Sequence, residues 1–156
     1  MKRITFISIC LLIGSLTHAQ NNGGTYNWAA GIKYTPIAVS LKHYNQKGDA
    51  IEFLLSKYNE GTRLTTLLEL CPKLTKSGSL RSIFGAGLHV GIWDSDIKKN
   101  SYIKNPIVGI DFVFGLEYKI PKAPIAFQLD YQPAIDFVGN SDTHVNWGGL
   151  TVKFCW

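Results

Sequence analysis

The 156-residue sequence has few cysteines, no long hydrophobic run and no concentration of basic residues. Its cysteines, Cys10, Cys71 and Cys155, show neither a CxxC motif nor the Cys/His spacing of a metal site. Beyond the N-terminal segment, no stretch reaches the ~18 consecutive apolar residues that predict a transmembrane helix. The basic residues are scattered, so nothing indicates nucleic-acid binding. If the chain enters a membrane, it must do so as β-strands.

The N-terminal segment has the features of a secretory signal peptide. Lys2 and Arg3 precede an apolar run over residues 4–13, and Ala19 completes the kind of small-residue motif at which such peptides are cleaved. The apolar run is too short for a membrane-spanning helix. Loss of the two basic residues lowers the formal net charge of the chain, which is +5, by two. We predict a signal peptide over residues 1–19, a flexible lead-in over 20–24 and one domain over 25–156.

The last stretch of the chain, residues 144–156, alternates like a β-strand with two different faces. Every second residue near its end is apolar, and the residues between them are small, polar or charged. Side chains of a strand point alternately to opposite faces, so one face meets an apolar environment and the other a polar one. The apolar face holds Leu150, Val152, Phe154 and Trp156.

The same period of two runs through the chain from residue 25 onward. Segments rich in Gly, Pro, Asn and Asp separate the alternating stretches and predict turns. The Leu-rich residues 67–70 suggest a helix on their own, but their flanks keep the period of two. We predict eight strands, over residues 25–35, 37–44, 50–58, 62–74, 82–93, 107–120, 125–137 and 144–156.

This pattern resembles the small eight-stranded outer-membrane β-barrels of bacteria, of the OmpA transmembrane domain, OmpX and opacity-protein kind. The resemblance covers residues 25–156 and rests on the alternating strands and the terminal Trp156. It implies an all-β fold, an antiparallel up-and-down transmembrane β-barrel in the outer membrane, in contact with outer-membrane lipids and lipopolysaccharide. It also implies that the outer-membrane assembly machinery reads an insertion signal formed by Leu150, Val152, Phe154 and Trp156.

An even number of strands returns the C-terminus to the side of the membrane from which the first strand started. If that side is periplasmic, the polar segment 94–105 lies outside and the tight turn 121–124 lies inside. Short periplasmic turns and longer outer loops are typical of such barrels. The lysines of 94–105 suggest contact with anionic sugars or a partner, but we interpret this segment as a solvated loop.

A soluble, lipocalin-like barrel is the alternative, because its strands also alternate but turn their apolar face inward. Three features favour the membrane barrel, of which one is the export signal together with the terminal Trp156. The apolar face is bulky, whereas the opposite face is rich in glycine, as a crowded lumen requires. Aromatic residues of the apolar face also gather near strand ends, as in the girdles of membrane barrels. These are Tyr26, Trp28, Tyr118 and Trp156 at the periplasmic end, and Tyr34 and Phe137 at the outer end.

The face opposite the apolar one collects most of the charged residues of the predicted barrel. Buried charges persist only when they are paired, so we interpret these residues as an ion-pair network that fills the lumen. A register that sets Trp93 opposite Ile107 places His89 opposite Asp111. The predicted luminal network comprises Lys42, Glu52, Arg63, Glu69, His89, Asp111, Glu117, Asp130 and Lys153, and the same face carries Lys33, Lys119 and Asp136.

The sequence favours a non-enzymatic barrel, monomeric and without cofactor or metal, that stabilises the membrane or presents loops for surface interaction. An enzyme that modifies lipid A is the alternative, although His43 on the apolar face has no serine beside it on its own strand. A narrow pore is the third possibility, but a lumen of this size holds little more than side chains. Cys71 and Cys155 fall on strands that lie across the barrel from each other, so we expect free thiols.

Overall fold

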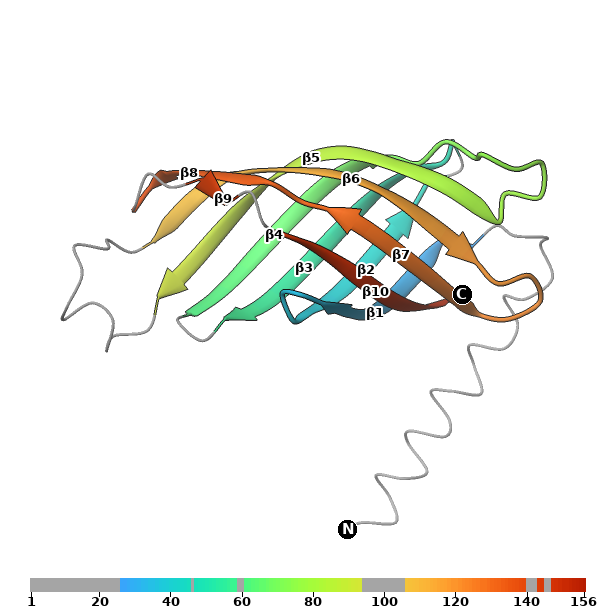
Figure 1. The fold of residues 1–156 in the computed structure, drawn as a ribbon, viewed down its shortest axis with the longest axis horizontal. Coiled ribbons are helices and arrows are strands. Elements are labelled where there is room, and N and C mark those ends of the chain that lie inside the picture. Colours follow the sequence, from blue (N-terminus) through green and yellow to red (C-terminus); the bar gives the residue numbers. More distant parts are fainter. Residues whose placement is uncertain (1–25, 46, 59–60, 94–105, 140–142, 145–146) are drawn as a thin grey trace, which may run out of the picture.

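The computed structural model describes residues 26–156 except residues 46, 59–60, 94–105, 140–142 and 145–146. Its strands form one antiparallel sheet that curls until β5 pairs with β6, which closes a barrel (Figure 1). The predicted all-β fold is confirmed, whereas the predicted signal peptide, lead-in and 94–105 loop lie outside the described residues. The strands are β1 (Trp28–Tyr34), β2 (Ala38–Tyr44), β3 (Asp49–Tyr58), β4 (Gly61–Leu70), β5 (Leu80–Trp93), β6 (Ile107–Lys119), β7 (Ile125–Tyr131), β8 (Ala134–Val138), β9 (Thr143–His144) and β10 (Gly148–Cys155).

These labelled strands occupy eight positions around the barrel, as predicted, because two of the positions are interrupted. β7 and β8 both pair with β6 and replace the single strand predicted over 125–137. Pro133 lies between them and has no N–H to donate, although its carbonyl still accepts a bond from the Phe112 N–H at 2.9 Å. β9 and β10 together replace the strand predicted over 144–156.

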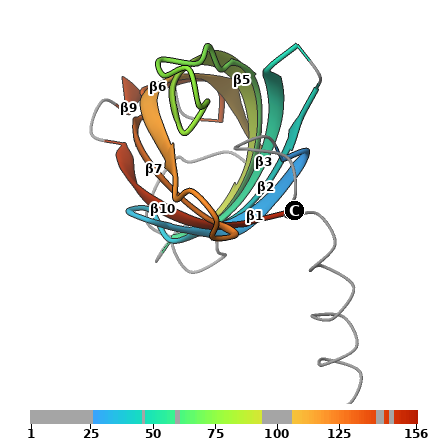
Figure 2. The ribbon, with the colours of Figure 1, turned by 90° about the vertical axis from the view of Figure 1, so that its right-hand side faces the viewer.

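Both ends of the described chain lie at one end of the barrel, which we call the terminal end. The N–H groups of Asn27 and Trp28 donate to the carbonyl of Trp156 at 3.2 and 3.0 Å. The connections from β2 to β3, from β4 to β5 and from β6 to β7 also lie at this end, on the right in Figure 1. Figure 2 looks at the barrel from the terminal end and shows the strands curving around a central lumen.

The outer surface of the barrel is apolar and the interior is polar. Burial alternates residue by residue along β4, from Gly61 inward to Leu70 outward. Three lysines of the interior, Lys33, Lys42 and Lys153, are at most 2% exposed. The outward side chains are among the most exposed large hydrophobic residues of the chain, and they include Ile32, Val39, Leu55, Leu64, Leu68, Leu88, Ile92 and Leu129.

The β4–β5 connection differs from the predicted one. β4 ends at Leu70, where residues 71–74 were predicted to extend it. Pro72, two residues later, has no N–H to donate to the ladder. Lys73, which the alternation placed on the inward face, is therefore exposed. β5 begins at Leu80, two residues before the predicted start, and this extension carries Arg81 into the interior.

Glycines on the inward face allow neighbouring strands to approach closely. A Cβ atom at Gly87 would lie 1.9 Å from the carbonyl oxygen of Thr66 and 2.9 Å from the Cα of Leu67 on β4. At Gly91, four residues further along β5, the nearest atom would be the Thr62 carbonyl oxygen at 3.6 Å, an ordinary contact. Backbone atoms move less readily than side chains, so only the first site strictly requires glycine.

We expect Gly87→Ala to destabilise the barrel by roughly 1–3 kcal/mol, because β4 must move to relieve the overlap. The matched control, Gly91→Ala, should leave stability unchanged or slightly raised, since alanine reduces the freedom of the unfolded chain. Urea unfolding of both variants, refolded in the same detergent micelles, measures the difference. Equal stability of the two variants would contradict this account of the β4–β5 contact.

Candidate functional site: the polar interior

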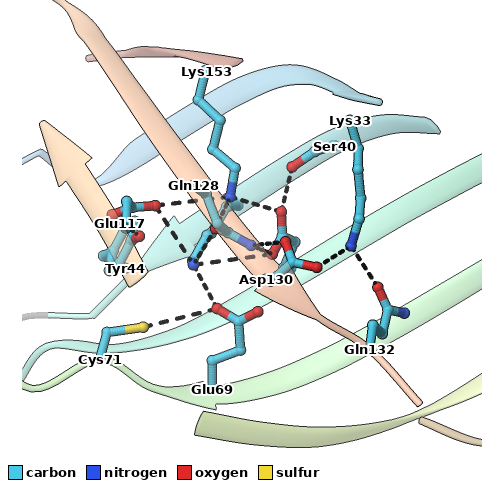
Figure 3. A network of polar contacts seen from close by, with 12 residues as sticks. Lys33, Ser40, Tyr44, Glu69, Cys71, Glu117, Gln128, Asp130, Gln132 and Lys153 are labelled. Atoms are coloured by element: carbon cyan, nitrogen blue, oxygen red, sulfur yellow. Dashed lines mark hydrogen bonds and ion pairs between the residues drawn. The ribbon is translucent and has the colours of Figure 1, made fainter. Parts of the chain in front are cut away.

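Six buried side chains of the lumen form what we call the central cluster: Lys42, Glu52, Glu69, Glu117, Gln128 and Lys153. Figure 3 labels the last four of them. Lys42 Nζ lies 2.5 Å from Glu69 Oε2 and 3.7 Å from Glu117 Oε2. Lys153 Nζ lies 2.7 Å from Glu52 Oε1. None of the six side chains has appreciable exposure, so each charge depends on its neighbours rather than on bulk water.

Gln128 on β7 holds the two lysines of the central cluster together. Its carbonyl oxygen accepts hydrogen bonds from Lys42 Nζ at 3.2 Å and Lys153 Nζ at 2.6 Å. Its amide nitrogen donates to Asp130 Oδ2 at 2.9 Å. Gln128 follows the alternation of β7 to the inward face, but it is absent from the predicted luminal network because an uncharged amide gives no ion-pair signal. The donor and acceptor ends of one amide nevertheless suit a position between ammonium and carboxylate groups.

A second group toward the opposite end, the His89 cluster, consists of Arg63, His89, Asp111 and Asp136. His89 Nδ1 lies 2.6 Å from Asp111 Oδ2, and His89 Nε2 lies 2.9 Å from Asp136 Oδ1. Arg63 Nη2 lies 2.5 Å from Asp111 Oδ1, and its guanidinium lies 4.0 Å from the centre of the Trp147 ring. The cation of Arg63 and the imidazole thus share one buried carboxylate.

The register that suggested the His89–Asp111 pair is wrong, although the two side chains do meet. Ile107 pairs with Gly91 rather than with Trp93, so His89 lies opposite Gly109 and Asp111 lies opposite Gly87. The contact is therefore diagonal across the two strands, within reach of these side chains. Glycine at position 109 makes room for the ring, because a Cβ atom there would lie 2.4 Å from His89 Cε1.

Lys33 and Gln132 connect the two clusters. Lys33 Nζ pairs with Asp130 and donates to Gln132 Oε1 at 2.8 Å. Gln132 in turn donates through Nε2 to Asp111 Oδ1 at 3.0 Å. Since Asp130 also accepts from Gln128, polar contacts run without interruption from the central cluster to the His89 cluster. The structure thus brings all nine residues of the predicted luminal network into one connected interior.

Two tyrosines close the network at the terminal end. Tyr26 and Tyr44 both donate to Glu117 Oε1, with a Tyr44 distance of 2.5 Å, and their rings meet edge to face at 4.9 Å between centroids. Tyr26 is 5% exposed, so its prediction as a girdle aromatic on the outer face is wrong. It precedes β1 and therefore does not follow the alternation of that strand. Burial raises the pKa of Tyr26 well above its ordinary value, so the hydroxyl stays a donor.

Cys71 and Cys155 are free and buried, as predicted. Burial raises the pKa of the Cys71 thiol to about 12, and its Sγ donates weakly to Glu69 Oε2 at 3.8 Å. Because the thiolate is the reactive form, we expect iodoacetamide at pH 8 to leave Cys71 unmodified in the folded protein and to alkylate it after denaturation. Mass spectrometry gives the readout, and a Ser77→Cys variant in the same exposed connection is the reactive control. Rapid alkylation of Cys71 in the folded protein would show that it is not buried.

The residues of the predicted assembly signal lie along β10, except Trp156, which lies just beyond its terminal end. Leu150, Val152 and Phe154 point outward with 46%, 44% and 37% exposure, and Trp156 is half-buried. The rings of Phe154 and Trp156 lie 6.1 Å apart. β10 therefore presents a row of apolar side chains on the outside of the barrel.

The described part of the chain contains no group of three or more His, Cys, Asp or Glu residues placed to hold a metal ion. The same residues contain no helix long and apolar enough to cross a membrane. Comparisons with protein-family models, with curated proteins and with solved structures each find no match. The geometry of the interior is that of mutually paired charges.

Proposed function

We propose that this protein is a non-enzymatic integral β-barrel of the bacterial outer membrane, which stabilises the membrane or presents its loops for surface interaction. The observation that carries the proposal is the polarity of the barrel. Exposed large apolar residues lie on the outward face of β1 to β8 and of β10, whereas ion pairs and hydrogen bonds fill the interior. A soluble lipocalin-like barrel has the reverse arrangement, with its apolar face inside.

The exposed apolar surface of the barrel favours a lipid environment. Soluble monomers rarely expose contiguous apolar patches larger than a few hundred Å². Here Ile32, Val39, Leu64, Leu88 and Leu129 each expose 45–63% of their surface on β1, β2, β4, β5 and β7. Each Å² of such surface costs about 25 cal/mol in water, and contact with acyl chains removes that cost. A closed barrel also satisfies its backbone groups between strands, as a lipid environment requires.

The terminal end faces the periplasm in this proposal, so the chain between β5 and β6 faces outward. Outer-membrane lipids and lipopolysaccharide surround the apolar surface, and the assembly machinery engages the outward face of β10 during insertion. The barrel acts as a monomer, with the signal peptide removed near Ala19. Three aromatic residues lie on the outer face near the terminal end: Trp28, Tyr118 and Phe127. Aromatic residues of membrane barrels gather at this level, where the membrane meets water.

Membrane fractionation with surface labelling tests location and orientation together. A short epitope inserted between Asn100 and Ser101 should label on intact cells, and the protein should fractionate with the outer membrane. The same epitope in the β6–β7 turn, after Lys122, should label only in permeabilised cells. Recovery in the soluble periplasmic fraction would refute the membrane location, and labelling at Lys122 on intact cells would reverse the orientation.

The alternative function, an enzyme that modifies lipid A, is not supported by the surroundings of His43. A groove of about 410 Å³ lies beside His43, and the described residues that line it include no serine, threonine or cysteine that could act as a nucleophile. His43 instead packs against Trp28, with ring centroids 4.3 Å apart. Mass spectrometry of lipid A from cells with and without the protein should therefore show no difference. A new or missing acyl chain would require an enzymatic function.

A further inference from the structure

A cavity of about 770 Å³ opens at the terminal end of the lumen, where Figure 2 looks into the barrel. Tyr26, Tyr44, Cys71 and Arg81 line it as buried residues. Residues of the β2–β3 and β4–β5 connections form its rim. The volume falls within the range of ~300–1,000 Å³ that is usual for small-molecule pockets.

The cations of this cavity outnumber its carboxylates. Lys47, Lys73 and Arg81 line it, whereas Asp49 is the one acidic residue among the described lining residues. Asp49 already accepts a hydrogen bond from Asn45 Nδ2 at 3.3 Å. Beneath the cavity, Glu117 lies opposite Arg81 in the pairing of β5 with β6. Its carboxylate receives the two tyrosine hydroxyls and lies 3.7 and 3.8 Å from the ammonium groups of Lys42 and Lys153, so one carboxylate is shared among several cations.

The charged group of Arg81 is fixed in position. Its guanidinium carbon lies 4.7 Å from the centre of the Tyr44 ring and 5.2 Å from that of the Tyr26 ring. The hydroxyls of both rings are anchored on Glu117, so the aromatic wall that supports Arg81 is itself held by hydrogen bonds. Arg81 exposes only 4% of its surface. An arginine that is buried and stacked in this way loses little conformational freedom when it binds an anion.

We propose that this cavity binds a small molecule through a phosphate or carboxylate group, with Arg81 as the principal contact and Lys73 and Lys47 as rim cations. The planar guanidinium matches either oxyanion, and the flexible ammonium groups attract it from the opening. The tyrosine rings provide a wall for the uncharged part of the ligand. Binding in this cavity requires the interior and the connections of the barrel, and it does not require a particular location of the protein in the cell. The binding proposal can therefore fail while the proposed membrane function holds, and the reverse.

The test uses the full mature barrel folded in a zwitterionic detergent and titrated by calorimetry with inorganic phosphate and, separately, with citrate. Arg81→Gln should weaken binding of the preferred anion by about tenfold or more, as expected for loss of a charge-assisted contact. Lys73→Gln, at an exposed rim position, should weaken it by a smaller factor. Lys122→Gln removes the same charge at the same end but outside the cavity, and it should leave affinity within about twofold. Binding should also weaken as salt is raised.

The two probes separate phosphate from carboxylate recognition, and either preference supports the site. If Arg81→Gln does not fold, Lys73→Gln compared with Lys122→Gln decides the outcome. Absence of saturable binding by both anions to the wild-type barrel overturns the proposal. It is equally overturned if Lys122→Gln weakens binding as much as Lys73→Gln, because attraction would then come from the general charge of that end.

Discussion

Phe112→Lys should destabilise the folded barrel in lipid vesicles by roughly 2–4 kcal/mol, the cost of a lysine near the bilayer midplane. Phe112 lies near the middle of β6, points outward and pairs with Ala86 near the middle of β5. It is 37% exposed on the isolated barrel, so in a water-soluble protein the same substitution would cost little, within about 0.5 kcal/mol. The size of the effect therefore distinguishes the two environments.

Phe137→Lys is the matched control for this experiment. It makes the same exchange on the outer face of β8, near the end of the strand and 56% exposed. Near the interface the cost should fall to about 0–1 kcal/mol. Urea unfolding in vesicles, followed by tryptophan fluorescence, measures both variants. Equal and small effects at the two positions would contradict a membrane-embedded outer face.

Lys42→Met should destabilise the barrel by about 3–5 kcal/mol, because it leaves buried carboxylates without their shared cation. Lys42 is 0% exposed, and its Nζ lies 2.5 Å from Glu69, 3.7 Å from Glu117 and 3.9 Å from Glu52. Adding Glu69→Gln removes one of the unpaired charges, so the double variant should be more stable than Lys42→Met alone. Such non-additivity is the signature of a direct pair.

Lys47→Met, at an exposed position of the β2–β3 connection, is the control and should change stability by no more than about 0.5 kcal/mol. The measurement is again urea unfolding under one detergent condition. An interior that serves catalysis would behave differently, since active-site charges often reduce stability and their removal then raises it. A stable Lys42→Met variant would therefore argue against the paired, structural interior described for this barrel.

The alternation of residues determined most of the architecture without help from tertiary contacts. The period of two is a local property of a strand, so it separated the apolar from the polar face of β2, β4, β6 and β7 and fixed the count of eight strand positions. It also placed every residue of the luminal network on one face, from Lys42 near the beginning of the barrel to Lys153 near its end. The alternation did not determine where the strands end. Pro72 and Pro133 have no N–H group to donate, so the hydrogen-bonded pairing is interrupted near them.

Only the tertiary structure decided which residues meet. A shift of two residues between β5 and β6 leaves every side chain on its own face, so the hydrophobic pattern could not distinguish the predicted register from the observed one. Contacts across the lumen join residues far apart in the sequence, such as Tyr26 with Glu117, and depend on the closure of the barrel. The same closure brings Arg81 against the tyrosine rings and Lys153 against Glu52. Long side chains from facing strands meet according to their distance in space, which the sequence pattern does not give.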